Sequence, residues 1–399
     1  MNKTSVRAKT LRVLEAAWTE PGFCVPNLEV YPHQWLWDSC FHSIIWAELG
    51  DARGEIELET ALRHQMDNGF VPHMTYWSTP DAGASFWGRP TTSTITQPPM
   101  YGHAAAELAR RGFEVSDALI SKLEQAFVYL LEGRARTSGG LIPIYHPWES
   151  GCDDSPRWDV VDGNGSSGPF SPTEWKKTKI DLTRSLVFDE YGAPVGNPGF
   201  EVGSIGFNSL VVFNLSEFLS IPGVSGRPRS AELAAESASL RSAIAGRWSD
   251  ETQTWLDDSE VTGRTPTSIV RRNSGCKTAD SLLALLVDPR NVGFDQLTNE
   301  EELGGRFGPP GVHRDEQSYD GSVYWRGPSW PQLNYLLAVA ARRAGNDKLG
   351  DRIVAGQRRG VETSGWAEYW NADTGAGLGA IPQTWSGLAI VAGHKTPWS

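Results

Sequence analysis

The sequence has little that would cross-link the chain or anchor it in a membrane. It contains 4 cysteines in 399 residues, at Cys24, Cys40, Cys152 and Cys276, with no CxxC pair and no Cys/His spacing typical of a metal site. A chain of this length does not need disulfides to build a core, so we expect four free thiols. No apolar run approaches the roughly 18 residues that a membrane helix needs, and the charged N-terminus lacks the apolar segment of a signal peptide. We therefore expect a soluble, cytoplasmic protein.

Basic residues are scarce relative to acidic ones. The chain has 36 Lys and Arg against 48 Asp and Glu, a net charge of −12, and the acidic residues are spread along the sequence. This balance argues against a nucleic-acid partner, so the expected partner is a small molecule, with a monomer or a homo-oligomer both open. Tryptophan is abundant, with 17 residues beside 42 glycines and 25 prolines. Aromatic loops of this kind favour a sugar ligand, because indole faces hold sugar rings.

Helical periodicity dominates the chain. Apolar residues recur three and four positions apart at 6–17, 38–49, 53–66, 102–111, 116–131, 207–219, 229–245, 278–286, 329–344, 348–362 and 384–392. Some connections are a few residues long, whereas others span 69–101, 137–206 and 305–328. Short turns that alternate with long loops are typical of helical hairpins stacked around a toroid. We predict an all-α fold, an (α/α)6 barrel forming a single domain over 1–399, with long catalytic loops on one face.

An aromatic segment precedes the second helical stretch. It reads YPHQWLWD from Tyr31 to Asp38. Asp38 can cap the following helix, since a carboxylate there accepts from free N–H groups. A carboxylate next to Trp35 and Trp37 can equally bind sugar hydroxyls. Both roles are compatible with the pattern.

Carboxylates crowd one loop, at 144–159. Glu149, Asp153, Asp154 and Asp159 lie there together with two tryptophans. Carboxyl groups held against aromatic side chains and against one another have raised pKa values. Such a loop can therefore keep an acid protonated near neutral pH.

Two further segments near the C-terminus combine aromatics with polar groups. In YWRGPSW at 324–330, Ser329 is placed to cap the next helix. In GWAEYWNADTG at 365–375, Glu368 is a lone carboxylate beside aromatics, either a catalytic group or half of an ion pair with Arg326. Two separate acidic centres, each surrounded by aromatics, favour glycoside hydrolysis, in which one group donates a proton and the other activates water or attacks the sugar.

Other chemistries find no support in the sequence. The segment from Asp162 resembles the start of a calcium loop, but Thr173 occupies the position that a bidentate Glu would need. No HExxH, GxSxG or Walker pattern is present. We expect neither a metal ion nor a cofactor.

The motifs together resemble glycoside hydrolase family 63, in particular its short bacterial branch of glucosylglycerate and mannosylglycerate hydrolases. The similar blocks are YPHQWLWDSCF (31–41), GFVPHM (69–74), ITQPP (95–99), HPWESGCDDSPRWD (146–159), YWRGPSWP (324–331) and EYWNADTG (368–375). They follow one another in family order over nearly the whole chain.

This resemblance implies an (α/α)6 barrel and an inverting hydrolase acting on α-linked glucose or mannose. By position in the family motifs, it implies that Asp153 is the general acid and Glu368 the general base. The residues that it implies at the sugar site are Tyr31, Gln34, Trp35, Trp37, Asp38, His73, Tyr76, Gln97, Trp148, Trp325, Arg326, Gly327, Trp330 and Trp366.

The chain departs from the family pattern near the expected leaving-group site. Asp154 replaces an Asn, which adds a negative charge beside the acid and is expected to raise its pKa or that of its neighbour. The sequences at 372–373 and 201–204 also differ from the usual ones. Because of these changes, the resemblance does not determine which leaving group the enzyme prefers. A glycerate carboxylate needs a basic partner, preferably an arginine, and the candidates are Arg326, Arg184, Arg157 and Arg89.

Three alternatives stay open. One is an α-glucosidase acting on neutral disaccharides or oligosaccharides. Another is a sugar epimerase or an unsaturated-uronide hydrolase on the same toroid. For an epimerase, His33, His73, His103, His146 and His313 lie near the expected loops. The third is a carbohydrate-binding protein without turnover.

Overall fold

Helices carry most of the regular structure. The computed structural model describes residues 3–161, 168–259 and 272–392, so the calcium-like segment that begins at Asp162 lies largely outside the described residues. The α-helices in these ranges are α1 (Lys3–Ala17), α2 (Leu36–Leu49), α3 (Arg53–Ala61), α4 (Pro80–Trp87), α5 (Tyr101–Arg110), α6 (Asp117–Val128), α7 (Pro172–Arg184), α8 (Ile205–Leu219), α9 (Ser230–Ala245), α10 (Asn291–Thr298), α11 (Pro331–Arg343) and α12 (Asp347–Ser364).

Shorter elements complete the chain. The π-helical turn η1 covers Tyr129–Gly133, and the 3-10 helices are η2 (Pro147–Ser150), η3 (Pro156–Trp158), η4 (Ser281–Leu286) and η5 (Thr384–Ile390). The strands form two-stranded antiparallel pairs: β1 (Trp18–Thr19) with β2 (Phe23–Cys24), β3 (Gln34–Trp35) with β4 (Met74–Thr75), β5 (Val187–Phe188) with β6 (Pro194–Gly196), β7 (Trp248–Ser249) with β8 (Thr254–Trp255), and β9 (Tyr369–Trp370) with β10 (Gly377–Leu378).

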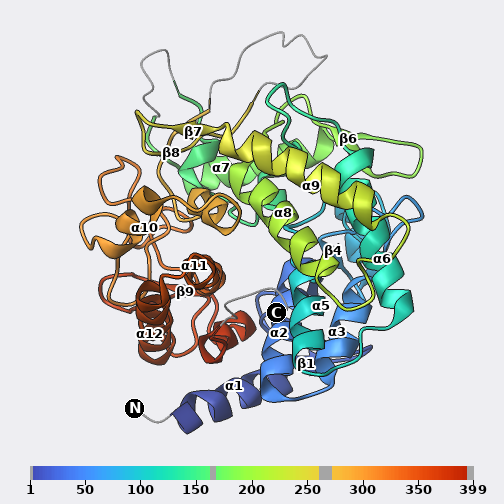
Figure 1. Cartoon of the computed structure of the whole chain (residues 1–399), viewed down its shortest axis with the longest axis horizontal. Helices are drawn as coiled ribbons and strands as arrows, with labels where there is room; N and C mark the ends of the chain where they lie inside the picture. Colours follow the sequence, from blue (N-terminus) through green and yellow to red (C-terminus); the bar gives the residue numbers. More distant parts are fainter. Residues whose placement is uncertain (1–2, 162–167, 260–271, 393–399) are drawn as a thin grey trace.

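The helices form a double ring (Figure 1). The inner ring is closed by successive contacts α2–α5–α8–η4–α11–η5, and η5 returns to α2. The helices α1, α3, α6, α9, α10 and α12 alternate with these elements along the chain, and α3, α9 and α12 pack directly on α2, α8 and α11. The inner helices are enclosed on nearly every side, since all but two residues in each of α2 and α8 are buried. The predicted all-α toroid is confirmed.

Most predicted helices coincide with observed ones, with informative differences. The stretch 53–66 is helical only to Ala61, and 278–286 and 384–392 contain 3-10 helices at η4 and η5. Ser329 does not cap the next helix. α11 begins at Pro331 with Trp330 at the cap position, and the Ser329 hydroxyl instead accepts from the Asn334 amide at 2.9 Å. Apolar spacing alone does not distinguish an α-helix from a 3-10 turn.

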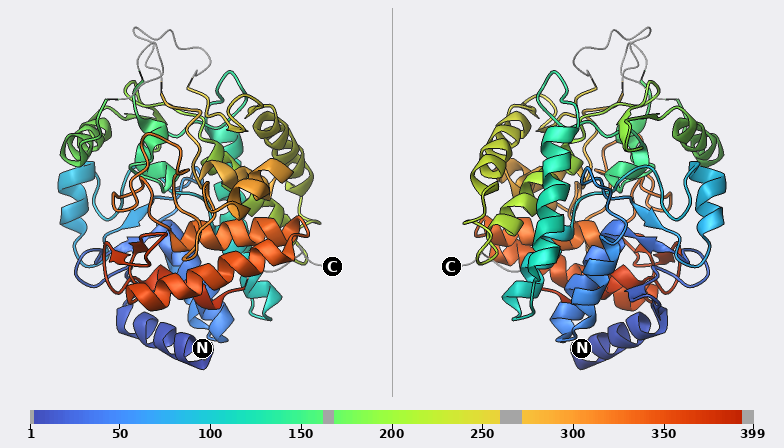
Figure 2. Two further views of the ribbon diagram at one scale, coloured as in Figure 1. Left: turned by 90° about the vertical axis from the view of Figure 1, so that its left-hand side faces the viewer. Right: turned by 90° about the vertical axis from the view of Figure 1, so that its right-hand side faces the viewer.

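Three helices were not predicted: α4, α7 and α10. Two of them lie within the long connections, α4 between α3 and α5 and α7 between α6 and α8. Figure 2 shows α7 and α4 on the same side of the molecule, one above the other. Both are mostly exposed, with two buried residues each, so they carry little apolar periodicity.

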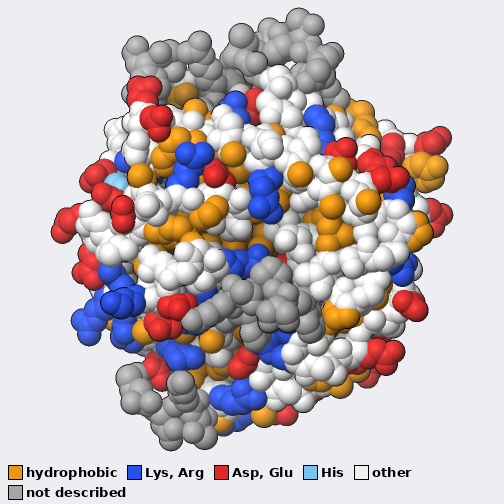
Figure 3. All heavy atoms as spheres, viewed as in Figure 1, with side chains coloured by type: hydrophobic (Ala, Val, Ile, Leu, Met, Phe, Trp, Pro, Cys, Tyr) orange, Lys and Arg blue, Asp and Glu red, His pale blue; other side chains and the backbone are white. Residues whose placement is uncertain are grey.

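The distribution of charged side chains and the state of the cysteines agree with the sequence-based predictions. Figure 3 shows acidic and basic side chains interspersed over one face. Cys24, Cys40, Cys152 and Cys276 are free thiols, as predicted, and all four are buried. Among the described helices, none combines the length and the apolar character needed to cross a bilayer.

Candidate active site

A cavity of about 80 Å³ contains both proposed catalytic carboxylates. Much of its lining comes from segments just before the inner helices α2, α5 and α11 and before η5. The lining residues are Pro26, Tyr31, Trp35, Trp37, Asp38, Gln97, Gly151, Asp153, Tyr324, Trp325, Glu368, Gln383 and Trp385. The chain therefore brings three separate aromatic segments, around Trp35, Trp325 and Trp385, together around the acidic groups.

Asp153 lies in the turn that follows η2. The indole Nε1 of Trp175 donates to its backbone oxygen at 3.1 Å, and the hydroxyl of Tyr324 hydrogen-bonds its side chain. Burial raises the pKa of Asp153 to about 7; nearby Lys179 opposes this shift, whereas Asp154 adds to it. A group with such a pKa is still partly protonated at neutral pH.

Asp154 is buried and forms an ion pair with Lys179 of α7. The expected effect of this residue on the acid is present, because its negative charge raises the pKa of Asp153. It is smaller than the effect of burial, and Lys179 acts in the opposite direction. The pKa of Asp154 is itself raised by burial.

Glu368 is held on both carboxylate oxygens. The hydroxyl of Tyr31 donates to Oε1 at 3.1 Å, and the backbone N–H of Ala380 donates to Oε2 at 2.9 Å. The indole of Trp385 donates to the backbone oxygen of Glu368 at 2.9 Å. Burial raises the pKa of Glu368 to about 7, while these hydrogen bonds to the carboxylate lower it. The hydrogen bonds fix the carboxylate in one orientation and offset part of the cost that burial imposes on its ionised form.

Gly379 allows this close packing around Glu368. Its φ is +70°, and a Cβ at this position would lie 2.3 Å from Oε2 of Glu368. Gly379→Ala is expected to lower kcat by about 10–100-fold, since a displaced catalytic group costs that much. Steady-state kinetics of the purified variant measure the effect.

The matched control is Gly345→Ala. Gly345 has a φ of +79°, and nothing lies within 4 Å of its added Cβ. It therefore reproduces the backbone strain without touching the site. Equal losses of kcat in the two variants would contradict the proposed contact with Glu368.

Asp38 lines the cavity and does not cap α2 as the sequence allowed. The helix begins at Leu36 with Trp35 at the cap position, and no side chain caps it. Burial raises the pKa of Asp38 to about 7, and the nearby His42 opposes that shift. Asp38 is therefore a third carboxyl group at the same cavity, available for sugar hydroxyls.

Six of the proposed sugar-site residues line the cavity, and the other eight lie outside it. Those at the cavity are Tyr31, Trp35, Trp37, Asp38, Gln97 and Trp325; those outside are Gln34, His73, Tyr76, Trp148, Arg326, Gly327, Trp330 and Trp366. Gln34 accepts from the Trp77 indole at 2.7 Å, and His73 lies 2.6 Å from the Ser93 hydroxyl. These two side chains are buried supports of neighbouring loops.

The remaining outer residues also have defined surroundings. Tyr76 and Trp148 pack in a small apolar cluster with Trp87, and Trp366 is buried beneath α1 with Lys9 4.0 Å from its ring. Gly327 passes so close to the backbone of residue 320 that a Cβ would meet its carbonyl oxygen at 2.5 Å. These residues therefore have packing contacts in the protein interior and do not line the cavity.

Trp330 stacks behind Trp325. The two rings are 3.7 Å apart and nearly parallel, at 4°. Tyr369 stacks on Trp330 at 4.4 Å. Trp325 presents its indole to the cavity, and Trp330 is the buried layer that supports it.

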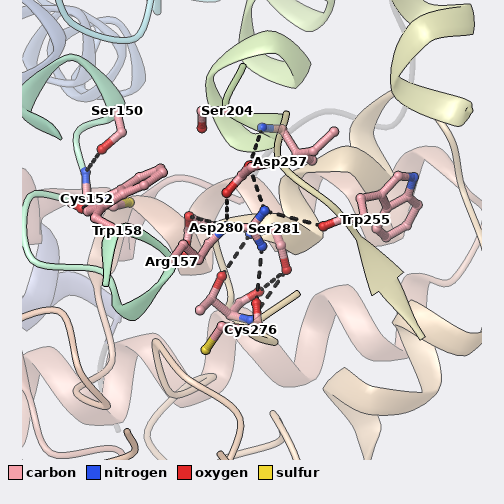
Figure 4. A network of polar contacts seen from close by, with 12 residues as sticks. Ser150, Cys152, Arg157, Trp158, Ser204, Trp255, Asp257, Cys276, Asp280 and Ser281 are labelled. Atoms are coloured by element: carbon pink, nitrogen blue, oxygen red, sulfur yellow. Dashed lines mark hydrogen bonds and ion pairs between the residues drawn. The ribbon is translucent and has the colours of Figure 1, made fainter. Parts of the chain in front are cut away.

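None of the four candidate arginines is among the residues that line this cavity. Arg326 binds Asp159 through both terminal nitrogens, at 2.6 and 2.7 Å, and is therefore not the partner of Glu368. Arg157 is fully buried and pairs with Asp257 (Figure 4). Arg184 is exposed beside Asp181, and Arg89 donates to the backbone of Tyr191 at 3.1 Å.

Sequence reasoning did not single out Pro26, Gly151, Tyr324, Gln383 and Trp385, although all five line the cavity. Tyr324 and Gly151 were inside the quoted motifs. A Cβ on Gly151 would lie 2.6 Å from the Trp37 ring, which explains the glycine. Gln383 and Trp385 carry the same signal as Trp35, because they lie at the start of an inner helix.

A buried hydrogen-bond chain holds the segment around Gln383 and Trp385. His42 lies 2.7 Å from Glu57 through Nδ1 and 2.6 Å from the Thr384 hydroxyl through Nε2. The Thr384 N–H donates to the Pro26 oxygen at 3.0 Å. The chain thereby fixes two lining segments, before α2 and before η5, against the core.

Two buried groups have ligand-type atoms close enough for a metal ion within the described ranges: Cys24, His42 and Glu57, and His103, Glu107 and Glu217. In the first, Glu57 already accepts from His42 and from the Trp46 indole. In the second, Arg110 pairs with both glutamates. In both groups the carboxylates thus already have partners within the protein, and neither group contributes a residue to the cavity lining.

Known proteins resemble the chain over nearly its full length. Residues 31–386 match the family described as the mannosylglycerate hydrolase MGH1-like glycoside hydrolase domain. The chain is 27% identical to a mannosylglycerate hydrolase of Thermus thermophilus, over 92% of this chain and 95% of that protein. It is 26% identical to the glucosylglycerate hydrolase of Mycolicibacterium hassiacum, over 91% and 92% of the two chains.

A solved structure gives the same result. The crystal structure of a GH63 mannosylglycerate hydrolase from Thermus thermophilus, in complex with Tris and D-glycerate, superimposes with a TM-score of 0.77 at 25% identity, covering 96% of this chain and 99% of that one. The resemblance to family 63 that the motifs indicated is confirmed. The chain belongs to the mannosylglycerate hydrolase MGH1-like glycoside hydrolases.

Proposed function

We propose that the chain is an inverting α-glycoside hydrolase that releases glucose or mannose from a small α-glycoside such as glucosylglycerate or mannosylglycerate. The observation that carries this proposal is the cavity shared by Asp153 and Glu368, whose pKa values are both raised to about 7. One such group can donate a proton near neutral pH while the other accepts one. The names of the relatives support the substrate class.

The two carboxyl groups have different roles in this proposal. Protonated Asp153 donates to the glycosidic oxygen as the bond to the anomeric carbon breaks. Ionised Glu368 takes a proton from a water molecule that attacks the opposite face of that carbon, so the product is a β-sugar. The hydrogen bonds from Tyr31 and Ala380 to Glu368 favour its ionised form. Because both groups titrate in one range, the productive state carries a single proton, on Asp153.

The cavity lining favours a second candidate, an α-glucosidase acting on neutral disaccharides. Among the residues that line the cavity there is neither Arg nor Lys. A buried carboxylate such as that of glycerate usually requires one. A neutral leaving group has no such requirement.

An epimerase has less support from the same lining. No histidine is among the lining residues of the cavity, although epimerisation needs a base at the sugar. His73 and His146 are buried nearby, and burial lowers the pKa of each to about 3. The pair of carboxyl groups fits hydrolysis better than either epimerisation or binding without turnover.

Time-resolved proton NMR tests the proposal directly. The purified protein is incubated with α-glucosylglycerate, α-mannosylglycerate and α-linked glucose disaccharides, and the anomeric signals are followed. A β-sugar that forms first, from a glycerate glycoside, is the expected result. A first-formed α-sugar would contradict inversion, and exclusive turnover of disaccharides would favour the second candidate.

Asp154→Asn is expected to move the alkaline limb of the kcat/KM profile to lower pH. The substitution removes a charge that raises the pKa of Asp153 and leaves the cation of Lys179 unopposed. Asp153 then loses its proton at lower pH, and with it the activity. The measurement is kcat/KM over pH 4 to 10.

Lys179→Met provides the opposite change. It removes the charge that lowers the pKa of Asp153, so the alkaline limb moves to higher pH. Two profiles that superimpose on that of the unmodified protein would show that this ion pair does not tune the acid.

A further inference from the structure

A second cavity, of about 460 Å³, is lined by residues that flank Tyr324 and Trp325 in the chain. Within 323–326 the residues divide between the two cavities: Tyr324 and Trp325 line the one with the catalytic carboxylates, whereas Val323 and Arg326 line the second. The two cavities therefore share a single turn of chain. We call the second one the outer cleft, defined by Asp159, Phe170, Ser318, Tyr319, Asp320 and Arg326 among its described residues.

The outer cleft borders the segment that carries the proposed acid. Pro172, the first residue of α7, lines the cleft. From the same helix, Trp175 donates to the backbone of Asp153 at 3.1 Å, and Lys179 pairs with Asp154. Arg326 of the cleft is close enough to lower the pKa of Asp154. In acid-assisted hydrolysis the leaving group lies on the side of the acid, so this is the side to which a longer leaving group extends.

The lining selects a neutral ligand. Arg326 is neutralised by both oxygens of Asp159, at 2.6 and 2.7 Å, and its guanidinium lies 3.6 Å over the Phe170 ring. Asp320 adds a further negative charge, and hydrogen bonds from Ser322 lower its pKa. An anion would be repelled here. Hydroxyl groups, in contrast, donate well to carboxylates, and the Tyr319 ring offers an apolar face.

We propose that the outer cleft binds the distal, neutral, hydroxyl-bearing part of a leaving group, so that the enzyme accepts α-glycosides whose leaving group continues into a further sugar unit. This inference rests on the proposed glycosidase function. It adds a binding site for a neutral sugar beyond the group that receives the proton of Asp153.

Kinetics on a pair of substrates test the site. One substrate is the hydrolysed α-glycoside that has the smallest leaving group. The other carries the same sugar, but its leaving group is a neutral disaccharide. The structure leads us to expect a higher kcat/KM for the longer substrate. Tyr319→Ala is expected to lower the ratio of kcat/KM for the longer substrate to kcat/KM for the shorter one about tenfold, because it removes one polar or stacking contact that only the longer substrate makes.

Tyr191→Ala is the matched control, because Tyr191 is 53% exposed and lies in neither cavity. Its ratio should equal that of the unmodified enzyme. A ratio that Tyr319→Ala leaves unchanged, or a long substrate hydrolysed no better than the short one, would overturn the outer cleft. Absence of turnover of either substrate would instead refute the glycosidase function on which the inference rests.

A binding measurement distinguishes failure of the outer-cleft proposal from failure of the proposed glycosidase function. Saturation-transfer NMR with maltose as the probe detects a neutral disaccharide on the protein without any turnover. In Glu368→Gln, maltose contacts that are weakened by adding Tyr319→Ala but not by adding Tyr191→Ala would support the outer cleft. Contacts of equal strength with and without Tyr319→Ala would overturn it.

Discussion

Asp153→Asn is expected to lower kcat by about 10²–10⁴-fold on an α-glycoside whose leaving group is a sugar or glycerate, because such oxygens leave poorly without a proton. The substitution keeps the shape of the side chain and the position of the turn that Trp175 holds. An α-glycosyl fluoride needs no such proton, so the variant should hydrolyse it at a rate close to that of the unmodified enzyme. Parallel kinetics on the two substrates measure the effect.

The contrast between the substrates identifies the role. A loss of equal size on both would contradict the assignment of Asp153 as the acid. Asp315→Asn is a suitable control, since its side chain is 80% exposed and lies in neither cavity. It should leave both rates unchanged.

Asp153→Asn is also expected to be more stable than the unmodified protein above neutral pH. The pKa of Asp153 is about 7 in the folded protein against 3.8 without its surroundings, so the folded state binds the proton more tightly than the unfolded one. Stability therefore falls as the pH rises from about 4 to 7, by up to about 4 kcal/mol for a shift of this size. An asparagine at position 153 does not ionise, so the variant does not lose this stability as the pH rises. Thermal unfolding at pH 8 and at pH 4 should show a higher Tm for the variant at pH 8 and little difference at pH 4.

The ring of helices could be predicted from the sequence because its signals are strong and local. The inner helices α8 and α11 have long apolar stretches, and short turns join α2 to α3 and α11 to α12. α7 was missed for the opposite reason. Ser171 caps it and Pro172 begins it, which are recognisable signals, but only Lys179 and Leu182 of this helix are buried. A helix that lies on the surface leaves no apolar periodicity to detect.

The site could be predicted as a set of segments but not as a set of side chains. Gln34 and Trp35 are adjacent in a strand, so they point to opposite sides, and Trp35 alone reaches the cavity. Trp325 and Trp330 have the same residue type and the same motif. Trp325 has a φ of +59°, which turns it to the cavity wall, and Trp330 packs behind it. Backbone geometry of this kind is set by tertiary packing, which the spacing of residues does not encode.

The leaving-group arginine illustrates the same limit. The sequence offers Arg157 and Arg326 in acidic and aromatic loops, where an anion-binding role is reasonable. In the structure each has an internal carboxylate partner, Asp257 for Arg157 and Asp159 for Arg326. These partners are 100 and 167 residues away in the sequence. Pairings over such separations depend on the complete fold.

Glu368→Gln is expected to lower kcat by about 10²–10⁴-fold on both the glycoside and the α-glycosyl fluoride. The water molecule must lose a proton whichever group leaves, so a better leaving group does not compensate for a missing base. The amide retains the size of the side chain and can still accept from Tyr31 or Ala380 through its oxygen. Kinetics of the two substrates, beside those of Asp153→Asn, separate the base from the acid.

A smaller side chain gives the complementary test. In Glu368→Ala, added azide can attack the anomeric carbon without giving up a proton, while Asp153 still protonates the departing oxygen. Turnover should therefore recover with azide and yield the β-glycosyl azide, because the attack comes from the side that Glu368 occupied. An α-glycosyl azide would place the attack on the other face and contradict inversion. Recovery with the β-product would place Glu368 on the face opposite the departing oxygen, where both the base of an inverting enzyme and the nucleophile of a retaining enzyme lie. The anomer that the unmodified enzyme forms first then separates the two, because a base directs water to give the β-sugar, whereas a nucleophile bonded to the sugar gives the α-sugar.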